Sequence, residues 1–477
     1  MIRPLLAAMG CCLLLSACGG RDPVQRELDR IKADGSPLTL EDLGLPPGGY
    51  EGPQWKSILV ISEKLAKERK EGGFNDYQVR AMKPVGPGMA EVATRLEALT
   101  AHQGKEPITW AQWDQMLAKT RSFMNSMPTS ETGRVFIPDY SRGMAAEVPH
   151  ANAAMNINKA ASWMILGDIQ GGKIDQALKE LSEARKWGKN LTGHSTLIEG
   201  LVHITCDNTL LNDSWELLQQ PSINELQLAR LAGVWEKNLD PQEVLLIWQG
   251  ERVGSWQTVS RFRTLKDLKD ASLLLSEARD RTEHQNPANW VADRVYLKML
   301  FDHDLAYYLS SFHRQEVLIK GWIKHGNFLP LRKEAQEQEK FLKTMPQWKR
   351  MRYLISSLAL PAISTAHDKF VTAIAQQHLL KTAIALKRYQ LAHKAWPDSL
   401  NQLVPAYLPA VPLDPIDGQP LRYKKSTHEA DGYSLYSIGV NGIDDGGDGT
   451  EMKPRENGKP DYRPDKTRDI LWPRAAP

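Results

Sequence analysis

An acidic, glycine-rich segment near the C-terminus offers a compact set of side chains for metal chemistry. Three carboxylates, Asp444, Asp445 and Asp448, lie close together in sequence, and the amide oxygen of Asn441 precedes them. Calcium prefers six to eight hard oxygen ligands in a flexible shell, and the interspersed glycines let the backbone turn its carbonyl groups inward. The segment therefore predicts a calcium site; a solvated acidic loop without an ion is the alternative.

Pairs of carboxylates on predicted helices are candidates for acid–base chemistry. The pairs considered are Glu243 with Glu251, and Asp302 with Asp304. A hydrolase of glycans or peptides would use one member as general acid and the other as general base. Acidic residues on helices are mostly solvated, however, and the sequence has no Gly-x-Ser-x-Gly, Walker loop, dinucleotide-binding fingerprint or His-Glu-x-x-His motif. We expect a protein that is not an enzyme, with a hydrolase as the alternative.

The N-terminus contains a cysteine whose expected chemistry is lipidation. Arg3 precedes an apolar run from Leu5 to Leu15, and the run leads into Ser16-Ala17-Cys18. A positive residue, an apolar core and small residues before the cut are typical of a secretory signal peptide. With cysteine at the cut, the segment resembles a bacterial lipobox. We expect residues 1–17 to be removed and Cys18 to carry lipid.

Lipid attachment at Cys18 predicts that the protein is located in the bacterial cell envelope. Several acyl chains anchor a protein stably without a transmembrane helix, so the chain should face the periplasm from a membrane surface. Gly19, rather than aspartate, follows the lipidated residue, which by analogy favours the outer membrane over the inner one. After processing, Cys206 is the one thiol without a lipid, and its apolar surroundings predict a buried structural role.

The charge balance excludes one class of partner. The 477 residues include 60 Lys and Arg against 57 Asp and Glu, which gives a formal net charge of +3. A dedicated nucleic-acid binder needs a basic surface, so we expect no nucleic acid as partner. The length suffices for two or three domains.

Most of the chain has helical periodicity. Residues 18–55 are rich in Gly and Pro and read as a tether with a short helix near Val24–Ala33. Residues 56–361 then repeat apolar positions at helical spacing, with Gly171-Gly172 separating two helices of a hairpin. Trp163-Met-Ile-Leu-Gly167 matches the opening of a tetratricopeptide repeat. The pattern predicts helical hairpins, either as an irregular bundle or as a solenoid.

The last part, residues 362–477, changes character. A helical run from Ala362 to His393 leads to Trp396-Pro397, and proline disfavours the α conformation of the residue before it. Two alternating segments, Pro420–Lys425 and Gly432–Ile438, predict antiparallel strands. The sequence thus predicts a mainly α protein that ends in a small α+β domain.

The motifs of this part resemble the C-terminal globular domain of the major pseudopilin of type II secretion systems. The likeness covers residues 366–472 and rests on elements in the family's order: Ala385–Tyr389, Trp396-Pro397, Leu403–Pro409, Asp414–Gly418, Tyr433–Gly439 and Asp469-Ile470. The resemblance implies a pseudopilin-like fold and a loop that binds calcium, with Asp469 joining Asn441, Asp444, Asp445 and Asp448 as ligands. Asn441 stands where the family usually has aspartate.

One departure from that family decides the functional expectation. A pseudopilin begins with an apolar filament helix, but the residues before Ala362 include Lys340, Lys343 and Arg352. We therefore expect a non-catalytic envelope lipoprotein that acts as a scaffold or a protein- or peptide-binding module. Its partners would be the membrane, through the lipid, and an envelope protein that the sequence does not identify. An accessory component of a secretion system is a further alternative, and likeness of fold alone does not transfer function.

Overall fold

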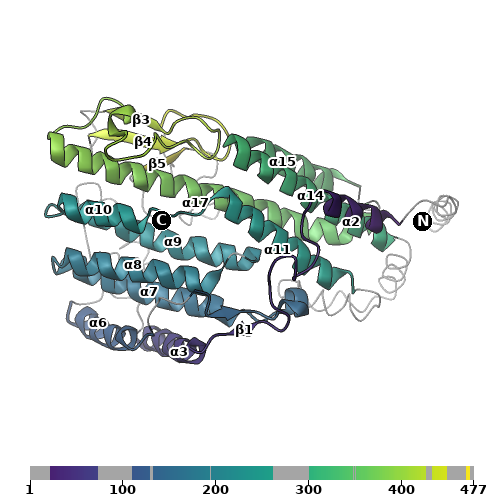
Figure 1. Cartoon of the computed structure of the whole chain (residues 1–477), viewed down its shortest axis with the longest axis horizontal. Helices are drawn as coiled ribbons and strands as arrows, with labels where there is room; N and C mark the ends of the chain where they lie inside the picture. Colours follow the sequence, from purple (N-terminus) through teal and green to yellow (C-terminus); the bar gives the residue numbers. More distant parts are fainter. Residues whose placement is uncertain are drawn as a thin grey trace.

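The structure is a computed structural model in which residues 22–72, 110–128, 133–193, 195–261, 300–346, 349, 351–425, 432–447 and 469–472 are described. Most of these residues are helical, and the strands form small antiparallel sheets. Figure 1 shows an elongated arrangement in which long helices lie roughly side by side and a sheet covers the C-terminal half of the longest one. The expected mainly α class is therefore confirmed.

The helices differ widely in length. They are α2 (Pro23–Ala33), α3 (Trp55–Gly72), α6 (Trp110–Asn125), α7 (Pro149–Gln170), α8 (Ile174–Thr192), α9 (Leu197–Leu218), α10 (Glu225–Val234), α11 (Pro241–Val259), α14 (Phe301–His325), α15 (Leu329–Thr344) and α17 (Leu354–His393). Short 3-10 segments occur at η1 (Tyr140–Ala145), which is kinked at Gly143, and at η4 (Met351–Tyr353) and η5 (Leu400–Leu403). Because α10 has 10 residues and α17 has 40, the described helices do not form a repeating unit of constant size. None of them is long and apolar enough to cross a membrane.

Helices α7 and α8 form the predicted hairpin. Gly172 adopts a positive φ of 68° in the turn, a conformation that suits glycine. Apolar side chains from both helices, among them Ile165 and Leu181, are buried in one core with Leu210 of α9. The helical hairpin is therefore confirmed, and α9 covers the face that two helices alone would leave exposed.

The helix starts follow capping chemistry, with one difference from expectation. The spacing Asp240-Pro241-Gln-Glu243 predicts a helix start, and Asp240 accepts a hydrogen bond from the Glu243 backbone N–H at 3.0 Å and caps α11. The similar spacing Ser222-Ile-Asn-Glu225 predicts Ser222 as the cap of α10, and this was wrong. Asn224 caps the helix and forms a reciprocal capping box with Gln227, so the helix begins two residues later.

Helix α17 occupies the middle of the molecule and joins its two ends. Its buried residues contribute to two cores: Phe370 and Ile374 pack in one with α11, α14 and α15, while Leu380 and Ile384 pack in the other with α8, α9 and α10. The expected boundary between 361 and 362 falls inside this helix, which begins at Leu354 and contains Pro361. The two regions assigned from sequence are thus continuous in structure.

The segment expected to be a tether packs against the helical body. Val24 and Ile31 of α2 are buried beside Phe301 and Leu305 of α14. Further along, strand β1 (Tyr50–Glu51) pairs antiparallel with β2 (Phe136–Ile137). The amphipathic pattern of α2 gives it an apolar face to bury, so from residue 22 onward the segment is part of the fold.

The C-terminal sheet has the order β3-β4-β5, with β3 (Arg422–Lys425), β4 (Tyr433–Ser437) and β5 (Ile470–Trp472) all antiparallel. The two predicted strands are confirmed, and β5 adds a third that the sequence did not predict as a strand. Leu435 and Trp472 are buried in the same core as Leu380 of α17. We call the described residues after α17 the head, and the described helices α3–α15 the helical body.

Helix α17 ends where its C-cap turns left-handed. Lys394 has φ 55°, and its backbone N–H bonds to the Gln390 carbonyl. The predicted helical run ended at His393, and α17 ends at that residue, before Trp396-Pro397. Leu400 and Leu403 then face the core from η5, and Val404, which follows them, is partly buried.

Candidate functional site

Arg422, on strand β3, is the centre of the polar cluster in the head. Its guanidinium contacts three carboxylates: Asp414 at 3.2 Å, Asp417 at 2.5 Å and Asp444 at 3.2 Å. Hydrogen bonding to Asp417 is the main cause that raises the Arg422 pKa above its ordinary value, against the effect of burial. We call Arg422 and these three aspartates the Arg422 cluster.

Asp414 is the buried member of the cluster. Its carboxylate accepts hydrogen bonds from the backbone N–H groups of Ile416 and Ile438, at 3.0 and 2.9 Å, and from the Ser437 hydroxyl at 2.9 Å. Burial raises its pKa to about 6, although these donors oppose the shift. The side chain therefore joins the Asp414–Gly418 turn to the end of β4.

The same turn attaches the head to the corner between α14 and α15. The Trp322 indole N–H donates to the Pro415 carbonyl at 2.8 Å, and the Phe328 N–H donates to the Ile416 carbonyl at 2.9 Å. Gly418 has φ 76°, and a Cβ there would lie 3.2 Å from the His325 carbonyl oxygen. Glycine is thus required by both conformation and space.

The residues predicted to bind calcium lie next to this cluster. Asp444 accepts from the Tyr436 hydroxyl and the Gly446 N–H, at 3.1 and 3.0 Å, in addition to its contact with Arg422. Asp469 accepts from the N–H groups of Asp445 and Gly447 at 3.2 and 2.8 Å. Asp469 therefore closes the loop onto the start of β5.

The remaining predicted ligands differ in position. The Asn441 side-chain oxygen accepts from the Ile443 N–H at 3.0 Å, and Asp445 contributes its backbone to the Asp469 contact. Asp448 lies outside the described residues. Among the residues that the structure describes, no group of three or more His, Cys, Asp or Glu is arranged to hold a metal. Backbone N–H groups and Arg422 already satisfy many of the oxygens that calcium would use.

One member of each carboxylate pair considered for hydrolysis accepts hydrogen bonds from the backbone. Asp304 is buried and accepts from the Ile355 and Ser356 N–H groups, at 2.7 and 3.2 Å, at the start of α17. Its neighbour Asp302 is exposed. Glu251 accepts from the Leu197 N–H at 3.1 Å, and Glu243 follows the cap of α11. Asp304 and Glu251 thus hold helix starts.

Of the two cysteines singled out by sequence, Cys206 lies within the described residues. Cys206 is 2% exposed in the core between α7, α8 and α9, and burial is the main reason why its pKa lies above the ordinary value. Its expected structural role is in keeping with this burial. Cys18 lies outside the described residues, so its expected lipidation stays a prediction.

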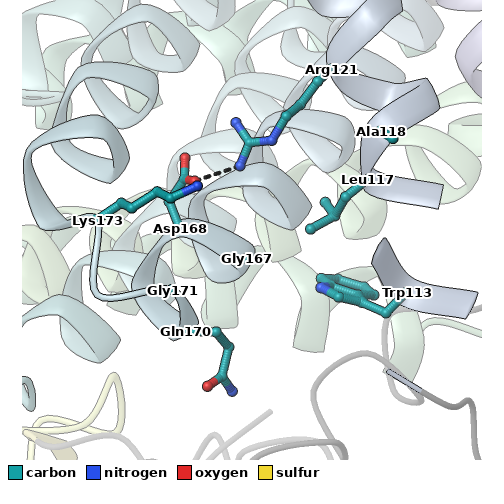
Figure 2. Close-up of a pocket in the computed structure, with 9 residues that line it drawn as sticks. All are labelled: Trp113, Leu117, Ala118, Arg121, Gly167, Asp168, Gln170, Gly171 and Lys173. Carbon is teal, nitrogen blue, oxygen red and sulfur yellow. Dashed lines mark hydrogen bonds and ion pairs between the residues drawn. The ribbon is translucent and has the colours of Figure 1, made fainter. Parts of the chain in front are cut away.

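A cavity of about 530 Å³ opens between α6, α7 and the turn into α8. Figure 2 shows Trp113, Leu117 and Arg121 on one side, and Asp168, Gln170 and Lys173 on the other. Gly167 lies at its floor, where an added Cβ would be 2.4 Å from a methyl group of Leu117. We call this site the Arg121 pocket.

Two acidic side chains share the guanidinium beside this pocket. Arg121 contacts Asp168 and Glu180, each at 2.6 Å. The second oxygen of each carboxylate is buried without a hydrogen-bond donor within the described chain. Burial raises the pKa of Glu180 to about 7, with the negative charge of Asp168 adding to the shift while Gln176 and Arg121 oppose it. The site can therefore take up a proton near neutral pH.

The sequence missed both arginine sites. Arg121 is 47 residues from Asp168 and 59 from Glu180, and no local pattern connects them. Asp414 and Asp417 were noticed as part of a turn, but their pairing with Arg422 depends on the register of the sheet. A buried Asp near the end of α7 was the only available signal, since the helical period places Asp168 on the apolar face with Ile165.

Comparison with protein-family models, curated proteins and solved structures finds no match to this chain.

Proposed function

We propose that this protein is a non-catalytic, lipid-anchored protein of the bacterial cell envelope that presents its head to a protein partner. The observation that carries the proposal is the continuity of α17. The 40 residues of this helix contribute to the core of the helical body and to the core under the sheet. A module that is built into a body in this way has a fixed orientation, as a docking unit requires.

The pseudopilin-like identity of the head is part of the same proposal. The order of elements supports it: the second half of α17 is followed by η5, the Asp414–Gly418 turn and an antiparallel sheet. The lipobox at Cys18 replaces the apolar filament helix that a pseudopilin would carry. The protein would thus use a pseudopilin-like head without entering a filament, anchored by lipid and facing the periplasm, with the outer membrane favoured.

The Arg121 pocket, which lies in the helical body and not in the head, is proposed as a second contact site, for a peptide segment of that partner. It combines an aromatic side chain, Trp113, with an exposed cation, Lys173, and the Arg121–Asp168 ion pair in its lining. Aromatic and charged groups around a cavity are the usual elements of peptide recognition. The partner is therefore expected to insert an apolar side chain and to place an acidic group near Lys173.

The partner proposal is tested by crosslinking in intact envelopes. Lys173→Glu should reduce recovery of the crosslinked partner about tenfold, because it reverses the charge at the pocket mouth. The matched control is Lys237→Glu, an exposed lysine between α10 and α11. If several crosslinkers recover no partner, or if both variants behave alike, the proposed binding site is wrong. Co-purification of an outer-membrane secretion channel would favour the accessory role in a secretion system.

The anchor is tested separately. The mass of the mature protein should show acyl groups on Cys18, and high salt should release the Cys18→Ser variant, but not the acylated protein, from the membrane. An unmodified thiol in the mature protein would contradict the anchor while leaving the partner proposal intact.

Calcium binding to the head is proposed as a conditional feature. Because Arg422 and backbone N–H groups engage Asp444 and Asp469, calcium would have to displace these donors. Millimolar calcium should raise the melting temperature of the full chain by mass action if it binds the native state. The Asp469→Asn variant should then lose that increase. An unchanged melting temperature would remove calcium from the proposal.

An envelope hydrolase is the second candidate function, and one observation favours it. Glu180, whose burial raises its pKa to about 7, lies beside the Arg121 pocket, and an acid–base residue works best near such a value. The contact with Arg121 opposes this role, because the guanidinium occupies one oxygen of the carboxylate. Loss of hydrolysis of peptidoglycan or peptides in Glu180→Gln, with partner recovery unchanged, would favour the enzyme.

A further inference from the structure

Three aromatic side chains form a cluster at one end of the molecule. Tyr307 of α14, Phe341 of α15 and Tyr353 of η4 contact one another, with ring centroids 4.9 to 5.9 Å apart. We call these three residues the aromatic pad. Phe341 is 46% exposed, and the adjoining Leu354 is 39% exposed. Large apolar groups gathered at a surface indicate a contact site.

The chain around the pad is strongly basic. Residues 340–354 include Lys340, Lys343, Lys349, Arg350 and Arg352, and this stretch contains no Asp or Glu. Lys340, Lys343 and Arg352 are exposed in the structure. Lys343 contacts Glu339 at 2.5 Å, so part of its charge is compensated. Aromatic rings beside several cations are the composition that suits the headgroup region of an anionic bilayer.

The pad lies at the same end of the molecule as α2, with which the described chain begins. Ile355, two residues after Tyr353, packs in the core that α2 forms through Val24 and Ile31. The charges of Arg352 and Arg26 both act on His303 and help to lower its pKa, after burial. Figure 1 shows α2 at one end of the long axis, with the sheet toward the other.

The distance to the proposed lipid is limited by covalent geometry. Asp22 is four residues from Cys18, and four residues span at most about 14 Å. Lipid on Cys18 would therefore hold this end of the protein against the membrane. The aromatic pad and its cations lie at this same end of the molecule.

We propose that the aromatic pad and the basic residues beside it rest on the headgroups of an anionic bilayer, as a second membrane contact next to the lipid anchor. This inference rests on the proposed anchor at Cys18. It assigns a function to Phe341, Tyr353, Lys340 and Arg352 that the anchor alone does not require. The contact fixes the orientation of the protein relative to the membrane, because a single flexible lipid attachment would leave the protein free to tilt.

The first test uses the mature, lipidated protein in vesicles of phosphatidylethanolamine and phosphatidylglycerol. An environment-sensitive dye on Phe341→Cys should shift its emission to the blue and be quenched by quenchers within the lipid. The same dye on Leu226→Cys, a residue of α10 that is 71% exposed, should show neither change. Buried Cys206 and acylated Cys18 would not take the label. If the mass shows that Cys18 is acylated but the dye at position 341 has the emission of a dye in water, the proposed membrane contact is wrong. The proposed lipid anchor is then unaffected.

The second test removes the anchor. The unlipidated Cys18→Ser chain should bind vesicles rich in phosphatidylglycerol, and each cation at the surface contributes about fivefold to such binding. Lys340→Glu with Arg352→Glu should weaken it at least tenfold. The control, Lys237→Glu with Lys424→Glu, changes the net charge equally at exposed sites elsewhere and should have little effect. Equal weakening of vesicle binding by both pairs of substitutions contradicts the proposal, and so does a Cys18→Ser chain that binds no vesicles. In the dye experiment, a shift that requires a crosslinkable envelope protein instead of lipid contradicts it as well.

Discussion

Arg422 in the head and Arg121 beside the pocket are each held between carboxylates, but the carboxylates differ in their other partners. Asp414 receives two backbone N–H groups and a hydroxyl besides Arg422. Asp168 and Glu180 each leave one buried oxygen without a donor in the described chain. The same charges therefore make a structural joint when the backbone completes the hydrogen bonds, and a proton-sensitive site when it does not.

The largest effect is expected from Arg422→Met. Removing the guanidinium leaves the buried Asp414 without its cation and frees the turn that attaches the head to α14. Breaking a buried ion pair by removing one partner costs about 3–5 kcal/mol. Chemical denaturation should show this loss in the free energy of unfolding. Lys425→Met is the control, because its exposed contact with Asp398 is worth less than about 1 kcal/mol; equal effects would mean that the Arg422 cluster does not hold the head.

A smaller and pH-dependent effect is expected from Arg121→Met. At neutral pH the variant should lose about 2 kcal/mol, since Asp168 and Glu180 lose their shared cation. At pH 5.5 most of the loss should be recovered, because the two carboxylates can then share a proton. Denaturation at both pH values checks this difference. A loss that is the same at both values would show that Glu180 does not take up the proton.

Glu180→Gln should remove part of the pH dependence of stability. The folded pKa of about 7 lies above the ordinary value of 4.5, so the folded protein binds the proton more tightly than the unfolded chain. The contribution of Glu180 is therefore full below about pH 4.5 and declines as the pH rises through 7, by about 1–2 kcal/mol. Relative to the parent, the variant should gain stability between pH 5 and 8. A constant difference would contradict the raised pKa.

Asp469→Asn should have the smallest effect, about 1 kcal/mol. The amide keeps one oxygen acceptor, so one of the two loop N–H contacts from Asp445 and Gly447 can remain. Thermal melting should show a small decrease, and hydrogen exchange should increase at Gly447 before it increases in β4. A loss as large as that of Arg422→Met would show that the loop, rather than the Arg422 cluster, attaches the head.

Local sequence signals predicted the elements of this fold better than its sites. The double glycine, the Asp240 cap and the alternation in Gly432–Ile438 each act over a few residues, and the structure confirms them. The cap of α10 was misplaced because Ser222 and Asn224 both suit a helix start, and Gln227 decides in favour of Asn224. The pairings of Arg422 and Arg121 needed the tertiary structure, since strand register and helix packing bring their partners together.

Helix α17 also sets the distance between the aromatic pad and the sheet. At 1.5 Å per residue, its 40 residues measure about 60 Å, from the pad at its beginning to the sheet over its second half. Each residue inserted into it would turn everything beyond by about 100° and lengthen it by about 1.5 Å. A homologous protein could bind its partner at another distance from the bilayer. Its helix would then have to differ in length by whole turns, so that the head keeps its orientation.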